Sequence, residues 1–222
     1  MKKIITLAVC AVIAAASLAA KKYEGIYSFA LGGTFNKTNL KNSSVKTKSA
    51  DLVVNAKWVP RAGNLTFKAL ADVGAVFGKE EEVFLSGEND DVYGTSFSFC
   101  GGVGWNFINN MRNTLGIYSI FGFIDQTYSK NIQEKNRYGY TITNVDYTAT
   151  YITFLAGLDL DYNFKITRKV GITAGCCFAI PVFGQAEFEL KNKYSGNTYK
   201  TQKDIHAGGY SITPRIGISF AP

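Results

Sequence analysis

Residues 148–164 read TATYITFLAGLDLDYNF, and their side chains fall into two interleaved rows. Every second residue is apolar, aromatic or threonine, whereas the residues between them include Asp159, Asp161 and Asn163. Successive side chains of a β-strand point to opposite faces, so the stretch predicts one long strand with an apolar face and a more polar face. It is longer than the ~9–11 residues that a tilted strand needs to cross a bilayer.

The same alternation occurs in eight runs, which cover residues 25–35, 50–59, 65–77, 95–107, 115–124, 148–164, 170–182 and 210–220. One row of each run carries no charged residue, and a charge facing lipid at mid-depth would cost ~2–4 kcal/mol. The connections alternate between long and short segments: 36–49, 60–64, 78–94, 108–114, 125–147, 165–169 and 183–209. These features predict an all-β fold, an eight-stranded antiparallel up-and-down transmembrane β-barrel with four long extracellular loops and three short periplasmic turns.

The first residues are typical of a cleavable export signal. Two lysines precede an apolar, alanine-rich core at residues 4–16, and residues 17–19 supply the small side chains that a signal peptidase reads. The core is shorter than the ~20 residues of a transmembrane helix. We therefore expect residues 1–19 to be a signal peptide and residues 20–222 to form one barrel domain in the cell outer membrane.

Composition agrees with a strand-rich chain. Its 222 residues include 22 glycines, 16 phenylalanines and 13 tyrosines but only 4 prolines. A secreted barrel of the lipocalin type would have the same alternation with its apolar row turned inward, so the ends of the runs help to distinguish the two. Aromatic residues gather there, as in the girdles of membrane barrels. Near the short turns these are Trp58, Trp105, Phe107, Tyr162 and Phe164.

The row opposite the apolar one contains charged residues, which a membrane barrel would hide in its lumen: Lys57, Lys68, Asp72, Asp159, Asp161 and Arg215. Two interpretations of this interior charge network stay open. Because an eight-stranded barrel has room for little more than side chains, the charges can pair into a plug that fills the lumen. They can instead form a selectivity belt in a small pore.

The long connections are polar and contain several tyrosines. Tyr138, Tyr140, Tyr194 and Tyr199 are candidates for contact with a host or environmental surface ligand, because such loops on a rigid scaffold suit recognition of proteins or glycans. The same residues are also consistent with strand hairpins that project beyond the bilayer, where tyrosines are cross-strand partners. The second long connection is acidic and offers oxygen ligands for a divalent cation, but it lacks the spacing of a calcium loop.

Other functional classes are not indicated. The formal net charge of +7 comes from scattered basic residues, so we expect no binding of nucleic acid. Cys100, Cys176 and Cys177 remain after signal cleavage, and an odd count without regular spacing predicts free thiols. The sequence contains no metal-binding motif, and we expect no cofactor.

The apolar row of the last run consists of Tyr210, Ile212, Pro214, Ile216, Ile218 and Phe220. Together with the export signal and the eight strands, this row resembles the C-terminal signal of small outer-membrane barrels of the OmpA, OmpX and OmpW kind. The resemblance implies contact with outer-membrane lipid and recognition of the last strand by the barrel-assembly machinery. Pro214 cannot donate to a ladder, and we expect a local kink or bulge there.

Barrels that resemble this one include lipid A deacylases and palmitoyltransferases, which rely on a histidine with a nearby hydroxyl and carboxylate. The sole histidine is His206, and Gly208 stands where the deacylase His-x-Ser arrangement has serine, so we expect no enzyme. We predict a non-enzymatic outer-membrane protein whose surface loops mediate adhesion or ligand contact, or which stabilises the outer membrane. The alternative, implied by the OmpW resemblance, is a small channel for hydrophobic or small polar solutes.

Overall fold

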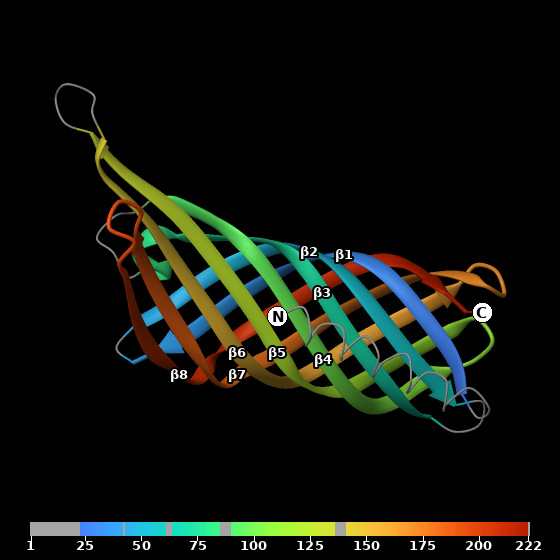
Figure 1. The fold of residues 1–222 in the computed structure, drawn as a ribbon. Coiled ribbons are helices and arrows are strands. Elements are labelled where there is room, and N and C mark those ends of the chain that lie inside the picture. Colours follow the sequence, from blue (N-terminus) through green and yellow to red (C-terminus); the bar gives the residue numbers. More distant parts are fainter. Residues whose placement is uncertain (1–22, 42, 61–63, 85–89, 136–140, 222) are drawn as a thin grey trace.

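The computed structural model describes residues 23–41, 43–60, 64–84, 90–135 and 141–221. They form one antiparallel sheet that closes on itself in the order β1 to β8 (Figure 1). The strands are β1 Tyr23–Leu40, β2 Ser43–Pro60, β3 Leu65–Lys79, β4 Asp91–Asn109, β5 Asn113–Lys135, β6 Thr141–Lys165, β7 Val170–Asn192 and β8 Thr198–Phe220. A short helix, α2 at Glu80–Val83, follows β3. The predicted eight-stranded up-and-down barrel is confirmed.

The wall of the barrel has an apolar outer face. Leu31, Val73 and Ile216 point outward and are 71%, 55% and 64% exposed, respectively. The alternate residues point inward and are buried, and they include charged side chains such as Lys57 and Asp161. Burying charge while exposing leucine is unfavourable in water but is favoured when hydrocarbon surrounds the barrel. The outer face is therefore suited to contact with lipid.

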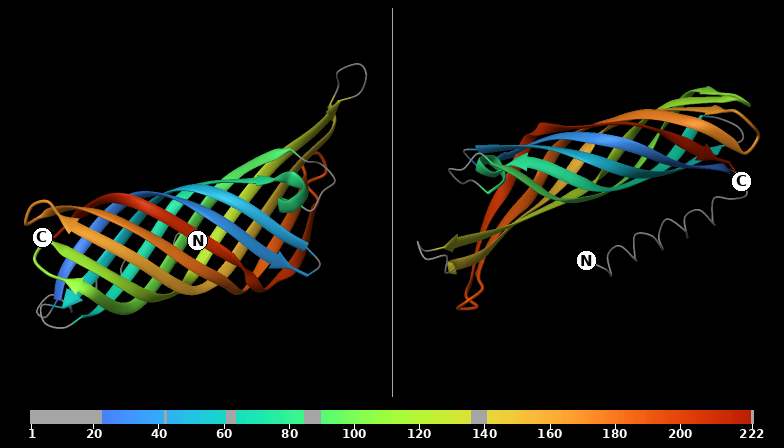
Figure 2. Two further views of the ribbon diagram at one scale, coloured as in Figure 1. Left: turned by 180° about the vertical axis from the view of Figure 1, so that it is seen from behind. Right: turned by 90° about the horizontal axis from the view of Figure 1, so that it is seen from above.

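The two ends of the barrel differ in their connections. Near the C-terminus the strands are joined by tight turns, as predicted, but at the other end strands continue through much of the predicted long loops. The β5–β6 and β7–β8 hairpins project beyond the remaining strands (Figures 1 and 2). Cross-strand pairs such as Ser129 with Thr148 and Lys130 with Tyr147 extend the ladder. This arrangement agrees with the projecting-hairpin interpretation of these segments.

No bulge is found at Pro214, but the β1–β8 ladder has no pair at Pro214 and Thr213. The β7–β8 register runs through Pro214, which is opposite Cys176, and the β1–β8 register is the same on both sides of the proline. Beside it, the hydroxyls of Thr34 and Thr213 share a hydrogen bond of 2.9 Å across the β1–β8 seam. A side-chain bond thus links the two strands where the proline has no N–H to donate.

The bulge in β8 lies at Gly208 and Gly209 instead. The β1–β8 register shifts between Thr38 and Asn39, opposite these glycines, whose φ angles are +108° and +93°. A Cβ on Gly209 would lie 2.1 Å from the carbonyl oxygen of Lys37. Glycine is needed here because other residues would meet both an unfavourable φ and a backbone clash.

The lipid-facing wall can be tested on β8. Ile216→Arg places a charge on the outer face near mid-depth and is expected to lower the free energy of unfolding by ~2–4 kcal/mol. Tyr210→Arg, on the same row but nearer the extracellular interface, is expected to cost ~0–1 kcal/mol. Reversible denaturant unfolding in lipid vesicles measures both. Equal costs for the two substitutions would contradict a lipid-facing wall.

Candidate functional site

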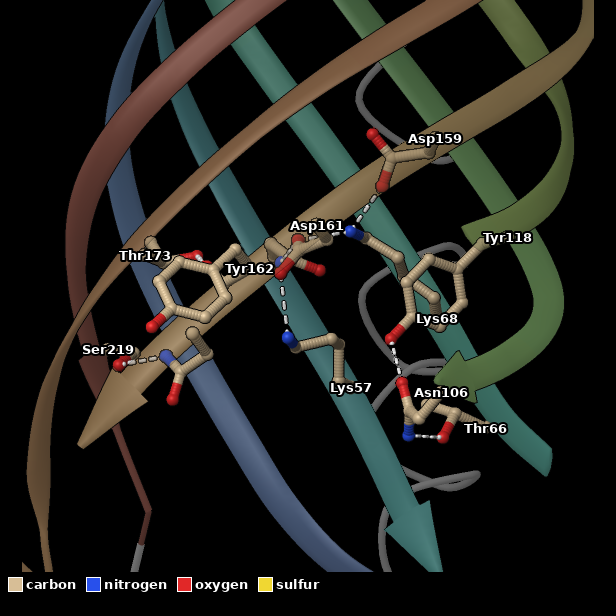
Figure 3. Close-up of polar contacts among 12 residues, drawn as sticks. Lys57, Thr66, Lys68, Asn106, Tyr118, Asp159, Asp161, Tyr162, Thr173 and Ser219 are labelled. Atoms are coloured by element: carbon tan, nitrogen blue, oxygen red, sulfur yellow. Dashed lines mark hydrogen bonds and ion pairs between the residues drawn. The ribbon is translucent and has the colours of Figure 1, made fainter. Parts of the chain in front are cut away.

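Five charged side chains meet in the lumen, in the half of the barrel nearer the C-terminus: Lys57, Lys68, Asp159, Asp161 and Arg215. We call them the ion cluster. Lys57 on β2 is opposite Lys68 on β3, and β6, which carries both aspartates, lies across the ring from β2. Figure 3 shows the two lysine ammonium groups directed toward the aspartates. The cluster therefore links opposite walls of the barrel.

Asp161 is the centre of the ion cluster. Its carboxylate accepts from Lys57 Nζ at 2.7 Å, from Arg215 Nη2 at 3.0 Å and from Asn55 Nδ2 at 3.0 Å. Lys68 Nζ also donates to it. Lys57 donates to Oδ1 and the other three donors share Oδ2, so both oxygens of this fully buried carboxylate have partners within the protein.

Arg215 holds Asp159 through two parallel hydrogen bonds. Nη1 lies 2.7 Å from Oδ1 and Nη2 lies 2.9 Å from Oδ2, the bidentate geometry that gives strong and directional pairing. In the ladders Gly175 stands between Arg215 and Asp161. A Cβ on Gly175 would lie 2.7 Å from Nη2, so the glycine leaves room for the guanidinium to reach β6.

Tyr118 continues the polar packing beside the ion cluster. Its ring lies under Lys68, with Nζ 4.9 Å from the ring centroid, and its hydroxyl donates to Asn106 Oδ1 at 2.6 Å (Figure 3). Tyr118, Asp159 and Asp161 have no exposed surface. Side chains fill the lumen at this level, which agrees with the plug interpretation and disfavours a selectivity belt around an open pore.

An apolar layer lies next to the ion cluster, and the sequence interpretation missed it. Val53, Leu70, Ile124 and Leu155 point inward and pack together as buried residues. Val53 and Leu70 occupy the same inward rows as the two lysines of the cluster. Alternation alone could not find this layer, because in those runs apolar residues occur in both rows.

The cysteines agree with the prediction of free thiols. Cys100 and Cys177 are buried in the apolar layer, Cys176 is half-buried, and all three are free. A buried thiol behaves as a small apolar side chain.

Asp72 was predicted to belong to the interior charge network, but the structure does not bring it into the ion cluster. It lies four residues beyond Lys68 on β3, which is about 13 Å along a strand. It is opposite Ser98 in the β3–β4 register. In the inward row of β2, Asp51 accepts from Thr34 Oγ1 at 2.7 Å. The lumen thus has a further polar layer in which carboxylates lie among hydroxyl groups.

The mouth of the barrel at the end with the long hairpins is closed by α2 and the residue that follows it. Val83 and Phe84 are buried in an apolar cluster, and the Tyr151 hydroxyl donates to the Val83 carbonyl oxygen. Glu80 is buried and pairs with Lys130 on β5. One acid of the acidic second connection is thus part of the closure. The part of the chain that the structure describes contains no group of acidic, histidine and cysteine side chains that could hold a metal ion.

The predicted aromatic girdle near the short turns is on the outer wall, with one residue covered. The exposed members are Trp105, Phe107, Tyr162 and Phe164. Trp58 is only 7% exposed. The register places it between Gly25 and Phe67, and the ring of Tyr27 lies over Gly25. Phe67 is thus its direct cross-strand neighbour on one side, and the Tyr27 ring lies near its neighbour on the other side.

The residues of the expected C-terminal signal share the outer face of β8: Tyr210, Ile212, Ile216, Ile218 and Phe220. Their alternates on the same strand, such as Ser211 and Ser219, are buried in the lumen. The strand thus presents a continuous apolar row toward lipid.

Two of the candidate ligand tyrosines are at the tip of the β7–β8 hairpin. Tyr194 and Tyr199 are 63% and 66% exposed. Near them Lys200 Nζ lies 2.8 Å from both Glu187 and Glu189, and the hydrogen bonds to these carboxylates raise the pKa of Lys200. Tyr138 and Tyr140 lie outside the described residues, as does the predicted signal peptide.

Neither the comparison with family models nor the comparison with curated proteins found a match. Among solved structures, the chain is similar to a major outer membrane protein of Thermus thermophilus, with 12% identity, a TM-score of 0.53 and coverage of 89% of this chain and 99% of that one. Neisserial surface protein A has 11% identity, a TM-score of 0.47 and coverage of 88% and 96%. OprG of Pseudomonas aeruginosa has 9% identity, a TM-score of 0.43 and coverage of 90% and 97%. The first likeness establishes the fold, which is that of outer-membrane β-barrels.

Among the residues that the structure describes, no helix is long and apolar enough to cross a membrane.

Removing the central carboxylate tests the ion cluster. Asp161→Asn leaves three cations facing one aspartate, and breaking a buried ion pair in this way costs ~3–5 kcal/mol. We expect that loss in the free energy of unfolding, measured in lipid vesicles. Asp51→Asn is the matched control, because hydroxyl groups contact this carboxylate, and it should cost only ~1 kcal/mol. A loss no larger for Asp161→Asn than for the control would contradict the role of the cluster.

Proposed function

We propose that this chain is a sealed, non-enzymatic barrel of the outer membrane that presents rigid hairpins at the cell surface for adhesion or ligand contact. The observation that carries the proposal is the filling of the lumen at successive levels. The ion cluster, the apolar layer and the α2 closure follow one another from the C-terminal end to the extracellular mouth. Such a barrel also adds a stable, non-leaking body to the membrane.

The apolar layer opposes the alternative of a solute channel. A channel needs a continuous wet path with groups that replace the hydration of the solute. Val53, Leu70, Ile124 and Leu155 are buried against one another, and their aliphatic side chains offer no polar group to a passing solute. A path for small polar solutes would have to disrupt both this layer and the buried ion pairs.

The β7–β8 hairpin suits recognition because its strands are already paired. Binding by a flexible loop loses conformational entropy, whereas a paired hairpin has lost it during folding. Pairing extends along β7 and β8 to Lys191 and Thr198, and Lys200 braces the two strands through Glu187. Tyr194 and Tyr199 are displayed on this support.

Export and assembly complete the proposal. We assign residues 1–19 to the export signal and the outward row of β8 to recognition by the barrel-assembly machinery. The support for the second assignment is the position of Ile216, Ile218 and Phe220 on one exposed face of the last strand.

Electrical recording tests the sealed lumen. The purified chain, reconstituted in a planar bilayer, is expected to give no stable single-channel steps, while a porin in the same bilayer does. Liposomes that contain the chain are expected not to swell in small sugars. Regular, ion-selective steps would overturn the sealed barrel and favour the small channel.

Two tyrosine substitutions test the hairpin surface. Tyr194→Ala with Tyr199→Ala is expected to lower the binding of cells that display the protein by about tenfold or more, because exposed aromatic residues often dominate recognition. An array of glycans and extracellular-matrix proteins provides the readout. Tyr27→Ala with Tyr162→Ala, at the opposite end of the barrel, is the matched control. Binding that is retained at wild-type level in the first variant, with heat-modifiable gel migration intact, would exclude these tyrosines.

A further inference from the structure

A row of unpaired lysines lies on the outside of the barrel, at the extracellular edge of the apolar band. Lys37 on β1 and Lys46 and Lys48 on β2 belong to the outward rows, since their alternates, such as Thr38 and Thr47, are buried in the lumen. In the part of the chain that the structure describes, none of the three lysine side chains makes an ion pair. Every charge of the ion cluster, by contrast, is paired.

The register brings these like charges together. Lys37 is directly opposite Lys46 on the same face of the sheet, where side chains of a cross-strand pair lie ~5 Å apart and like charges are destabilising. The last pair of the β2–β3 ladder is Thr47 with Gly78, so Lys79 follows on the neighbouring strand beside Lys46. Lys79 is paired with Asp91 at 2.9 Å, whereas the ammonium groups of Lys37 and Lys46 make no ion pair among the described residues.

Lys46 and Lys48 line a hollow in the outer surface, and Lys37 is the cross-strand neighbour of Lys46 beside it. The hollow has a volume of about 490 Å³, and its lining includes Lys46, Lys48, Phe77, Tyr93 and Tyr210. Glu82 also lines it, but its carboxylate accepts the backbone N–H of Lys46 at 2.7 Å. The hollow thus combines free ammonium groups with aromatic walls, and its acids are already engaged with the protein.

The hollow lies at the level where the headgroups of lipids are expected, and this position indicates the kind of ligand. Phe35, Lys48 and Phe77 are consecutive cross-strand neighbours, so Lys48 stands within the row of aromatic residues that marks the bilayer interface. Lys37 and Lys46 lie one step further out, at the level of lipid headgroups. Below them the outer wall continues as apolar side chains such as Leu52 and Val73.

We propose that this hollow binds the phosphate groups of an anionic lipid of the outer leaflet, of the phosphorylated glycolipid class. A phosphate between Lys37, Lys46 and Lys48 removes the repulsion between them, the sugar packs on Tyr93 and Tyr210, and the acyl chains lie along the apolar wall. The inference rests on the proposed position of the barrel in an outer membrane. It commits to a lipid, because the hollow opens sideways from the wall at headgroup depth.

Native mass spectrometry tests the site. The purified full chain in detergent micelles is titrated with lipid A, which carries two phosphates, and retained lipid is counted. Lys37→Gln/Lys46→Gln/Lys48→Gln is expected to weaken retention by about tenfold or more, and the corresponding triple arginine variant is expected to retain it within about twofold. Lys169→Gln/Lys191→Gln/Lys193→Gln makes the same change in net charge away from the hollow and is expected to leave retention unchanged.

A stability measurement and a competition experiment separate loss of the lipid site from loss of the fold. In vesicles of phosphatidylcholine alone, the triple glutamine variant is expected to be at least as stable as the wild type, because it loses only the repulsion. Wild-type retention of lipid A by that variant overturns the site. Two outcomes would overturn the assignment to a lipid. One is displacement of lipid A by inorganic phosphate at equal phosphate concentration. The other is lysine-dependent binding of heparin with no lipid retention. Vesicle insertion and bilayer recordings of the same variants report separately on the sealed barrel.

Discussion

The structure depends on the inability of hydrocarbon to solvate a charge or an unpaired peptide group. That constraint closes the sheet into a ring, since an open edge would leave N–H and C=O groups without partners. It also favours inward positions for the charges that lie at mid-depth, where Asp159 and Asp161 meet Lys57, Lys68 and Arg215 from other strands. The ion pairs are the consequence of closure, and they in turn fix which walls face each other across the lumen.

Closure of the sheet leaves a barrel with a filled lumen and hairpins that project from one end. Interior side chains pack in alternating polar and apolar layers, and α2 folds over the mouth, so the lumen offers little room for a ligand. Contacts with other molecules are then left to the projecting hairpins and the outer wall. The strong asymmetry between tight turns at one end and long hairpins at the other fits this division (Figure 2).

Local alternation was enough to predict the strands, the apolar outer face and the set of inward charges. It could not predict partners across the lumen, because those depend on register and on the shear of the closed sheet. Asp72 and Asp161 look alike in sequence, yet only Asp161 lies at the height of Lys57. Pro214 was a visible irregularity, but the bulge lies at Gly208 and Gly209, where a positive φ is required. The burial of Trp58 was not visible in the sequence either, since its cross-strand partners, Gly25 and Phe67, are known only from the register.

The outer lysines differ from the charges of the ion cluster in how they are compensated. Inside the barrel, the side chains of the ion cluster are shielded from solvent, and each charge has a partner within hydrogen-bond distance. At the headgroup level, water and lipid phosphates can both compensate a lysine, so unpaired cations are tolerated there. Tolerance alone does not explain why Lys37 and Lys46 are placed opposite each other beside an aromatic hollow. A shared anion does explain it, because one phosphate turns a repulsive cross-strand pair into two attractive contacts.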